Sequence, residues 1–125
     1  MTKVLVVEDE RNIAELLAAV LTGEGYQVLV AMNGREGLDL LAREPPQLVL
    51  CDHMMPVMDG ATMLEAMAAD PSLRSIPVVM MSAMREAAVA KCYSGYAAFL
   101  HKPFKLLELL DVVKRTLGTG NVEAS

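Results

Sequence analysis

Tryptophan is absent from this chain of 125 residues, and aromatic residues make up only 4% of it. Surfaces that bind nucleic acid by stacking bases on aromatic rings are therefore not expected. Basic residues are not in excess either, since 11 lysines and arginines face 16 aspartates and glutamates, giving a net charge of −5. Because nucleic-acid binding depends largely on neutralising phosphates with basic side chains, we expect no direct contact with DNA or RNA.

Long apolar runs and paired cysteines are also missing. No apolar stretch reaches the roughly 20 residues that a membrane-spanning helix needs, so we expect no membrane contact. Cys51 and Cys92 lie far apart and form no CxxC pair, which fits a reduced, cytoplasmic protein. We expect no signal peptide, because Lys3 leads straight into a short apolar run that an acidic cluster ends.

Short apolar runs alternate with helix-like segments along the whole chain. The runs are apolar throughout, which predicts strands covered on both faces. They cover residues 4–7, 27–31, 47–51, 76–81 and 97–100. The helix-like segments cover residues 13–21, 34–43, 60–69, 85–92 and 106–117. This alternation predicts an α/β domain with a five-stranded parallel sheet and helices on both faces.

Two of the predicted helices allow more specific expectations about their faces and ends. In the first helix, an apolar face should comprise Ile13, Leu16, Leu17, Val20 and Leu21. In the last helix, Leu107 and Val112 fall off the apolar face, which leaves a partner surface or scattered exposed apolar side chains as alternatives. We expect Gly118 to end this helix, so that residues 1–118 form one domain and 119–125 a flexible tail.

Polar side chains follow four of the five apolar runs. Glu8 and Asp9 follow the first, Asp52 the third, Ser82 the fourth and Lys102 the fifth. Each residue alone fits a helix cap, a turn or a solvated charge. Together they meet at the carboxyl edge of one parallel sheet, where such folds bind ligands.

The three carboxylates in this set would repel one another in a confined cleft. Lys102 offsets one charge, and a divalent cation with oxygen ligands would offset the rest, for which Mg²⁺ is well suited. A carboxylate beside a metal and a lysine suits phosphoryl transfer to aspartate.

Four motifs in order resemble the receiver domains of bacterial two-component response regulators, of the chemotaxis-type single-domain kind. They are VLVVEDE at 4–10, DHMMPVMDG at 52–60, MSA at 81–83 and FLHKPF at 99–104, and the resemblance covers about residues 3–117. It implies a doubly wound, flavodoxin-like sheet with strand order 2-1-3-4-5 and five helices.

The resemblance also implies roles for individual residues. Asp52 looks like the phosphoacceptor, and Glu8, Asp9 and Asp52 match the Mg²⁺ ligands, together with the backbone carbonyl of Met54. Glu8 departs from the aspartate usual in the family, and its longer arm should make it a secondary, water-mediated ligand.

Residues later in the chain match the phosphoryl-binding and switch positions. Ser82 and Lys102 match the hydroxyl and the lysine that bind the phosphoryl group, and the Lys102–Pro103 bond is typically cis in the family. Phe99 stands at the aromatic switch position, which is commonly tyrosine. Ser82 and Phe99 together would form the switch.

Other residues near the site have simpler interpretations. His53 and His101 are not expected to take part directly in the chemistry, and Cys51 should pack in the core. Met54 and Met84 stand two residues past Asp52 and Ser82, where a side chain can orient the hydrolytic water. Because a thioether orients water poorly, we expect a long-lived phosphorylated state.

The resulting hypothesis is a signalling switch rather than an enzyme acting on a separate substrate. The resemblance implies a histidine kinase or phosphotransfer protein as donor, and a target bound by the last two helices and last strand. Two possibilities stay open: that the chain forms a homodimer, and that it is a receiver domain cut from a longer regulator or hybrid kinase.

Two alternative functions belong to other classes. A receiver-like interaction module without phosphorylation would be expected to lack the nucleophile, an acidic ligand or the lysine, and none is missing. A small phosphohydrolase with an aspartyl intermediate needs a second carboxylate two residues after the nucleophile, where this chain has Met54.

Overall fold

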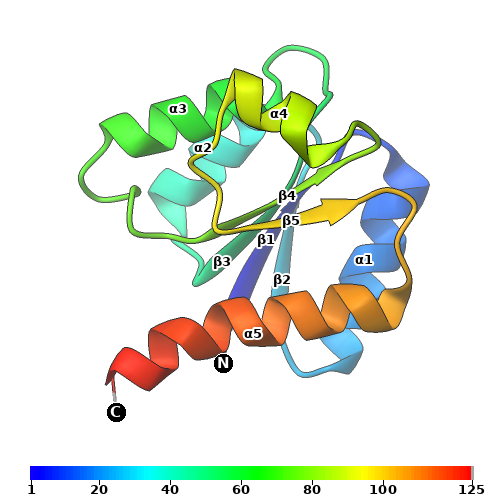
Figure 1. Cartoon of the computed structure of the whole chain (residues 1–125). Helices are drawn as coiled ribbons and strands as arrows, with labels where there is room; N and C mark the ends of the chain where they lie inside the picture. The colour runs from blue at the N-terminus through cyan, green and yellow to red at the C-terminus, as the bar shows by residue number, and fades with distance from the viewer. Residues whose placement is uncertain (125) are drawn as a thin grey trace.

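The computed structural model describes the backbone of residues 1–124 and the side chains of residues 1–118 apart from Cys92. Strands and helices alternate without interruption (Figure 1). The strands are β1 Lys3–Val7, β2 Gln27–Ala31, β3 Leu48–Asp52, β4 Val78–Ser82 and β5 Ala98–His101. The helices are α1 Arg11–Gly23, α2 Gly34–Arg43, α3 Gly60–Ala69, α4 Glu86–Cys92 and α5 Leu106–Ala124.

The five strands form one parallel sheet in the order β2-β1-β3-β4-β5. Helices α1 and α5 cover one face, and α2 and α3 cover the other (Figure 1). The predicted α/β class, strand order and helix number are therefore confirmed. The strand limits differ slightly from the expected ones, because Asp52 and Ser82 are the last residues of β3 and β4 rather than the first residues of the loops.

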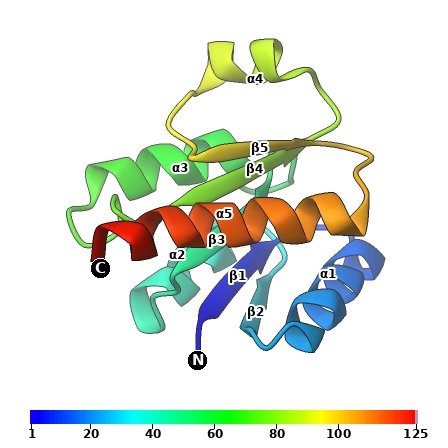
Figure 2. The same ribbon diagram turned by 60° about the horizontal axis from the view of Figure 1, so that its bottom comes forward.

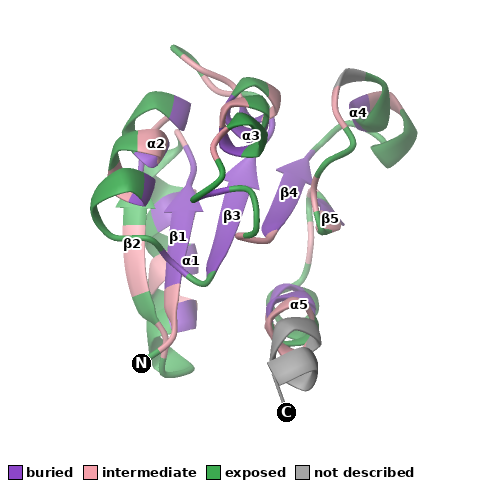
Figure 3. Cartoon of the chain, turned by 90° about the vertical axis from the view of Figure 1, so that its left-hand side faces the viewer, coloured by how far each residue is buried: buried purple, intermediate pink, exposed green. Residues whose placement is uncertain are grey.

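The core consists of two apolar layers, one on each face of the sheet. Alternate residues of one strand point to opposite faces, so Leu5 and Val7 enter one layer while Val4 and Val6 enter the other. Cys51 packs in the layer beneath α2 and α3, as expected. Figure 3 shows β3 and β4 buried along their length and β1 buried except at its start. The edge strands β2 and β5 are only partly covered, so the expectation of coverage on both faces was wrong for these two strands.

Individual helix positions differ from the predicted faces. Leu16, expected on the buried face of α1, is half exposed, whereas Ala14 is buried. On α5, Leu107 is 80% exposed as predicted, but Val112 is only 8% exposed and packs beside Leu109. The prediction that Val112 lies off the core was wrong, because α5 is covered over a wider arc than one narrow apolar stripe.

The last helix also extends further than the sequence indicated. Helix α5 continues to Ala124, six residues past Gly118. Glycine inside a helix costs only about 1 kcal/mol relative to alanine, so it does not have to end one. The flexible tail at 119–125 stays a prediction. Its side chains and all of Ser125 lie outside the described residues.

The loop between β3 and α3 is unusually constrained. A Cβ atom on Gly60 would lie 2.5 Å from the backbone oxygen of Asp52, so only glycine lets α3 begin this close to the end of β3. The Gly60 N–H donates to the carbonyl of His53 at 2.9 Å. Within the same loop, Val57 has φ 67°, a left-handed conformation that is strained for a β-branched residue. The loop is thus held tightly against the strand that carries Asp52.

Asp59 ends this loop and caps α3. Its Oδ1 accepts a hydrogen bond from the Thr62 N–H at 2.9 Å. That bond is the main reason why the pKa of Asp59 lies below its usual value. A carboxylate with a lowered pKa stabilises the fold above its unfolded pKa, and this contribution is lost as the pH falls through the folded pKa.

We predict that Asp59→Ala lowers the free energy of unfolding at pH 7 by about 1 kcal/mol. The difference from the parent should shrink as the pH falls below about 4. Asp59→Asn keeps an acceptor oxygen and should lose less. Urea unfolding at several pH values measures these differences. An alanine deficit that persists unchanged at low pH would contradict the ionic cap.

Candidate phosphoacceptor site

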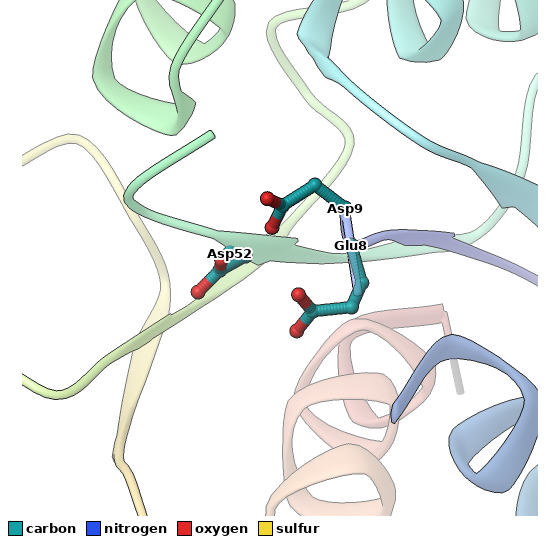
Figure 4. A group of neighbouring side chains, drawn as sticks. All are labelled: Glu8, Asp9 and Asp52. Carbon is teal, nitrogen blue, oxygen red and sulfur yellow. The ribbon is translucent and has the colours of Figure 1, made fainter. Parts of the chain in front are cut away.

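Three carboxylates converge at the carboxyl edge of the sheet. Glu8 and Asp9 follow β1 directly, and Asp52 ends the neighbouring strand β3. Their side chains point toward one another (Figure 4), and one oxygen from each lies within 4.8 Å of the others. The structure thus brings together the three acidic residues that the sequence predicted at one edge.

Lys102 lies between two of these carboxylates. Its Nζ is 2.9 Å from Glu8 Oε1 and 2.9 Å from Asp52 Oδ1. Glu8 is fully buried, and its second oxygen, Oε2, accepts a hydrogen bond from the Glu10 N–H at 3.2 Å. The bond that follows Lys102, to Pro103, is cis, as the resemblance implied.

Burial and repulsion make this cluster costly to ionise. Burial raises the pKa of Glu8, and the nearby Asp52 raises it further, against the opposing effect of Lys102. The pKa of Asp52 is also raised, first by burial and then by Asp9. Burial alone would lower the pKa of Lys102, but its hydrogen bonds to Glu8 and Asp52 raise it overall. One ammonium therefore faces three carboxylates, which leaves two negative charges uncompensated.

This donor set fits a divalent cation. Two uncompensated negative charges match one Mg²⁺ ion, which binds through a few carboxylates and keeps several waters. Asp9 is only partly buried and the Asp52 side chain is 9% exposed, whereas the Glu8 side chain is fully buried and both of its oxygens already have partners. The site thus suits Mg²⁺ bound mainly through Asp9 and Asp52.

Ser82 ends β4 beside the carboxylates and is almost fully buried. Its backbone carbonyl accepts from the Lys102 N–H at 2.8 Å, which ties it to the lysine. Its Oγ accepts from the Met84 N–H at 3.0 Å. A serine hydroxyl that accepts in this way keeps its own proton available for donation to an oxyanion.

Phe99, Met54 and Met84 differ in how far they are buried. Phe99, in the middle of β5, is partly buried and packs against the core layer beneath α2 and α3. Its ring also contacts Tyr96, with ring centroids 5.8 Å apart. Met54 and Met84 are 63% and 38% exposed, so both side chains reach the surface beside the site.

The two histidines have different surroundings. His53 is buried, and its Nδ1 has no hydrogen-bond partner among the described residues. His101 is exposed, and its Nε2 lies 3.1 Å from the carbonyl of Ala83. No sequence pattern predicted this contact or the hydrogen bond from the Tyr96 hydroxyl to Glu86 Oε2 at 3.1 Å. Both bonds join residues that are distant in sequence, and no motif marks them.

A doubly wound sheet with three carboxylates, a hydroxyl and a lysine at its carboxyl edge defines the receiver class of signalling domains. Residues 4–114 match the response regulator receiver domain family. The chain belongs to this family, and the resemblance found in the sequence is confirmed.

Relatives in this family differ in length and architecture. The chain is 42% identical to response regulator PleD of Caulobacter vibrioides over 103 residues, which are 81% of this chain but 23% of PleD. It is 38% identical to sporulation initiation phosphotransferase F of Bacillus subtilis, over 92% of this chain and 93% of that protein. The DNA-binding response regulator MtrA of Mycobacterium tuberculosis is 35% identical, over 97% of this chain and 53% of MtrA.

Solved structures show the same arrangement. The signal receiver domain of a signal transduction histidine kinase from Syntrophus aciditrophicus superposes with a TM-score of 0.88 at 34% identity, covering 95% of this chain and 92% of that one. The receiver domain of sensor histidine kinase PA1611 from Pseudomonas aeruginosa has a TM-score of 0.85 at 26% identity, covering 94% and 98%. That structure has a magnesium ion coordinated in the active-site cleft.

We predict that Asp9→Asn weakens Mg²⁺ binding more than Glu8→Gln does. The Asp9 variant should lose roughly tenfold or more in affinity, because a charged ligand is removed. The Glu8 variant should lose only a few-fold, because Glu8 is already bonded to Lys102 and the Glu10 N–H. Titration with Mg²⁺ followed by NMR measures both affinities, and equal or reversed losses would contradict this ranking.

Proposed function

We propose that this chain is a phosphorylation-controlled switch that accepts a phosphoryl group on Asp52. Phosphorylation-dependent signalling is the general function of its family. The observation that supports the proposal most directly is the position of Lys102, 2.9 Å from both Asp52 and Glu8 within the carboxylate group. A lysine shared between the nucleophile and a neighbouring acid can neutralise charge on either side of a transferred phosphoryl group.

Glu8, Asp9 and Asp52, together with the backbone carbonyl of Met54, are the proposed Mg²⁺ ligands. The magnesium ion in the PA1611 receiver supports a metal at the corresponding edge. When bound, Mg²⁺ would neutralise negative charge on the phosphoryl oxygens. The donor is proposed to be a phosphohistidine of a histidine kinase or phosphotransfer protein.

In the transfer step, an Asp52 carboxylate oxygen attacks phosphorus in line and forms the new P–O bond. The P–N bond to the donor histidine breaks, and its electron pair stays on the imidazole nitrogen. The ion pair between Lys102 and Asp52 then weakens, and Lys102 forms a new ion pair with a phosphoryl oxygen. The Ser82 hydroxyl donates its free proton to another phosphoryl oxygen.

An apolar groove beside the site is the proposed contact for the donor protein. It has a volume of about 340 Å³ and lies between α1 and the start of α5. Leu16 and Leu106 line it and are exposed, and Lys102 forms part of the same groove. A donor that brings phosphorus to Asp52 would pass this groove, so an apolar side chain of the donor can seat there.

The output of the switch is proposed to reach a protein target through α4, β5 and α5. Movement of Ser82 toward the phosphoryl group would leave room that Phe99 can fill, which reshapes this face. We propose no direct nucleic-acid contact by this chain, on the basis of its net charge of −5. MtrA is named a DNA-binding response regulator, but the match with this chain covers only 53% of MtrA.

Two further parts of the proposal concern activity and location. The chain would catalyse only its own phosphorylation and dephosphorylation, rather than acting on a separate substrate. A cytoplasmic location is proposed from the few, unpaired cysteines, of which Cys51 is a free buried thiol. None of the helices that the structure describes is long and apolar enough to cross a membrane.

We predict that acetyl phosphate with Mg²⁺ adds one phosphoryl group to the parent, measured by intact mass. Asp52→Asn should abolish the addition, because an amide is not a nucleophile for this transfer. The matched control is Asp39→Asn on the exposed side of α2, which should be labelled like the parent. Labelling of the Asp52 variant at the parental level would disprove the assignment of the nucleophile.

We also predict that Met54 and Met84 prolong the phosphorylated state. A thioether is a weak acceptor and no donor, so neither side chain can hold the attacking water in line. Met54→Asn and Met84→Glu should each speed phosphate loss by roughly tenfold, less than the 10²–10⁴ of a true general base. Phosphate release from purified phosphoprotein gives the rates. Unchanged rates in folded variants would show that the methionines only pack.

A further inference from the structure

Among the described residues, helix α4 has the fewest buried residues of the five helices. It has seven residues, and Val89 is its only described side chain that is buried. Arg85, at its N-cap position, makes no side-chain capping bond. Figure 2 shows α4 beyond the edge strand β5, apart from the other helices. Its position therefore depends on few interactions, and each of them has a large share in fixing it.

Two side chains hold the segment from Ala83 to Glu86, which leads into α4: Tyr96, two residues before β5, and His101, the last residue of β5. His101 Nε2 lies 3.1 Å from the carbonyl of Ala83, and since a carbonyl only accepts, Nε2 is the donor. The Tyr96 hydroxyl donates to Glu86 Oε2 at 3.1 Å. We call these two hydrogen bonds the β5 clamp, because one secures each end of the segment.

The β5 clamp is connected to both halves of the proposed switch. Ala83 directly follows Ser82, whose Oγ accepts from the Met84 N–H inside the clamped segment. The position of the segment therefore fixes the direction of the serine hydroxyl. At the other end, the Tyr96 ring packs against the Phe99 ring at an interplanar angle of 46°. Phe99 cannot change its rotamer without moving against the ring that holds Glu86.

We propose that Tyr96 and His101 are positioning residues that hold the segment 83–86, and with it the Ser82 hydroxyl, in the arrangement described above. The inference rests on the proposed function and adds two residues that regulate it. Both clamp bonds are made in this arrangement, so they stabilise it relative to any other position of the segment. Weakening them therefore changes the fraction of molecules in each arrangement of the segment, and with it the rate of phosphorylation. Tyr96 thus supplies the hydroxyl that Phe99 lacks, from a position three residues earlier.

The experiment compares single variants of the full chain. Tyr96→Phe removes only the hydroxyl, and Tyr26→Phe makes the same change at the opposite edge of the sheet as a control. His101→Leu removes the donor, whereas His101→Gln retains one. The readouts are amide hydrogen exchange of residues 83–91 without Mg²⁺, and the initial rate of phosphorylation by acetyl phosphate with Mg²⁺.

We expect Tyr96→Phe and His101→Leu each to speed amide exchange in this segment by about three- to tenfold. This is the change in the local opening equilibrium expected for the loss of one hydrogen bond. The phosphorylation rate should change about two- to fivefold, in the same direction in both variants, with Mg²⁺ affinity unchanged. Tyr26→Phe and His101→Gln should behave like the parent in both readouts.

Unchanged exchange in the two clamp variants would overturn the inference, because the bonds would then not hold the segment. Faster exchange with an unchanged phosphorylation rate, or with rates that change in opposite directions in the two variants, would also overturn it, because the two bonds would then not act together on the site. A parent chain that accepts no phosphate contradicts the proposed function itself, and the inference falls with it. Measuring the parent first therefore separates the two failures.

Discussion

The charge imbalance around Lys102 is the constraint on which the site depends. One ammonium lies 2.9 Å from Glu8 and from Asp52, while Asp9 adds a third carboxylate to the same edge. Without a cation, burial and repulsion raise the pKa of Glu8 and of Asp52. A cation bound at this edge, and the phosphoryl group of the proposed transfer, would offset this cost. A structure optimised only for stability would not place three acids there.

The two apolar layers make this arrangement possible. Glu8 and Asp52 come from β1 and β3, which are neighbours in the sheet although more than 40 residues separate them in sequence. Parallel strands with the observed register bring their carboxyl ends to the same level, where Val7 pairs with Cys51 one residue before the acids begin. The rigid sheet therefore fixes the spacing of the carboxylates, and Gly60 lets α3 close over Asp52 without a clash.

Much of this arrangement could be predicted from the sequence, because it depends on periodicity and on strand ends. The limits of α2 and α3 were predicted to the residue, and the acidic cluster followed from parallel topology. Other features depend on contacts between distant residues. Val112 is buried because α5 is covered over a wide arc, and Val57 adopts a left-handed φ because the loop around it is constrained. No local pattern contains that information. The hydrogen bonds of His101 and Tyr96 are unpredictable for the same reason.

The structure separates a rigid part from a movable one, and the separation follows from burial. Asp52 and Ser82 end strands, and Glu8 directly follows one, whose residues are all or almost all buried, so their backbone positions are fixed. Helix α4 contributes one buried side chain among the described residues. The hydrogen bonds of Tyr96 and His101 hold the segment that leads into it. Hydrogen bonds of about 1 kcal/mol shift an equilibrium without abolishing either state, whereas a buried apolar contact of several kcal/mol would lock it. Polar attachment of α4 is therefore what a reversible switch requires, and an apolar interface in its place would make the helix structural.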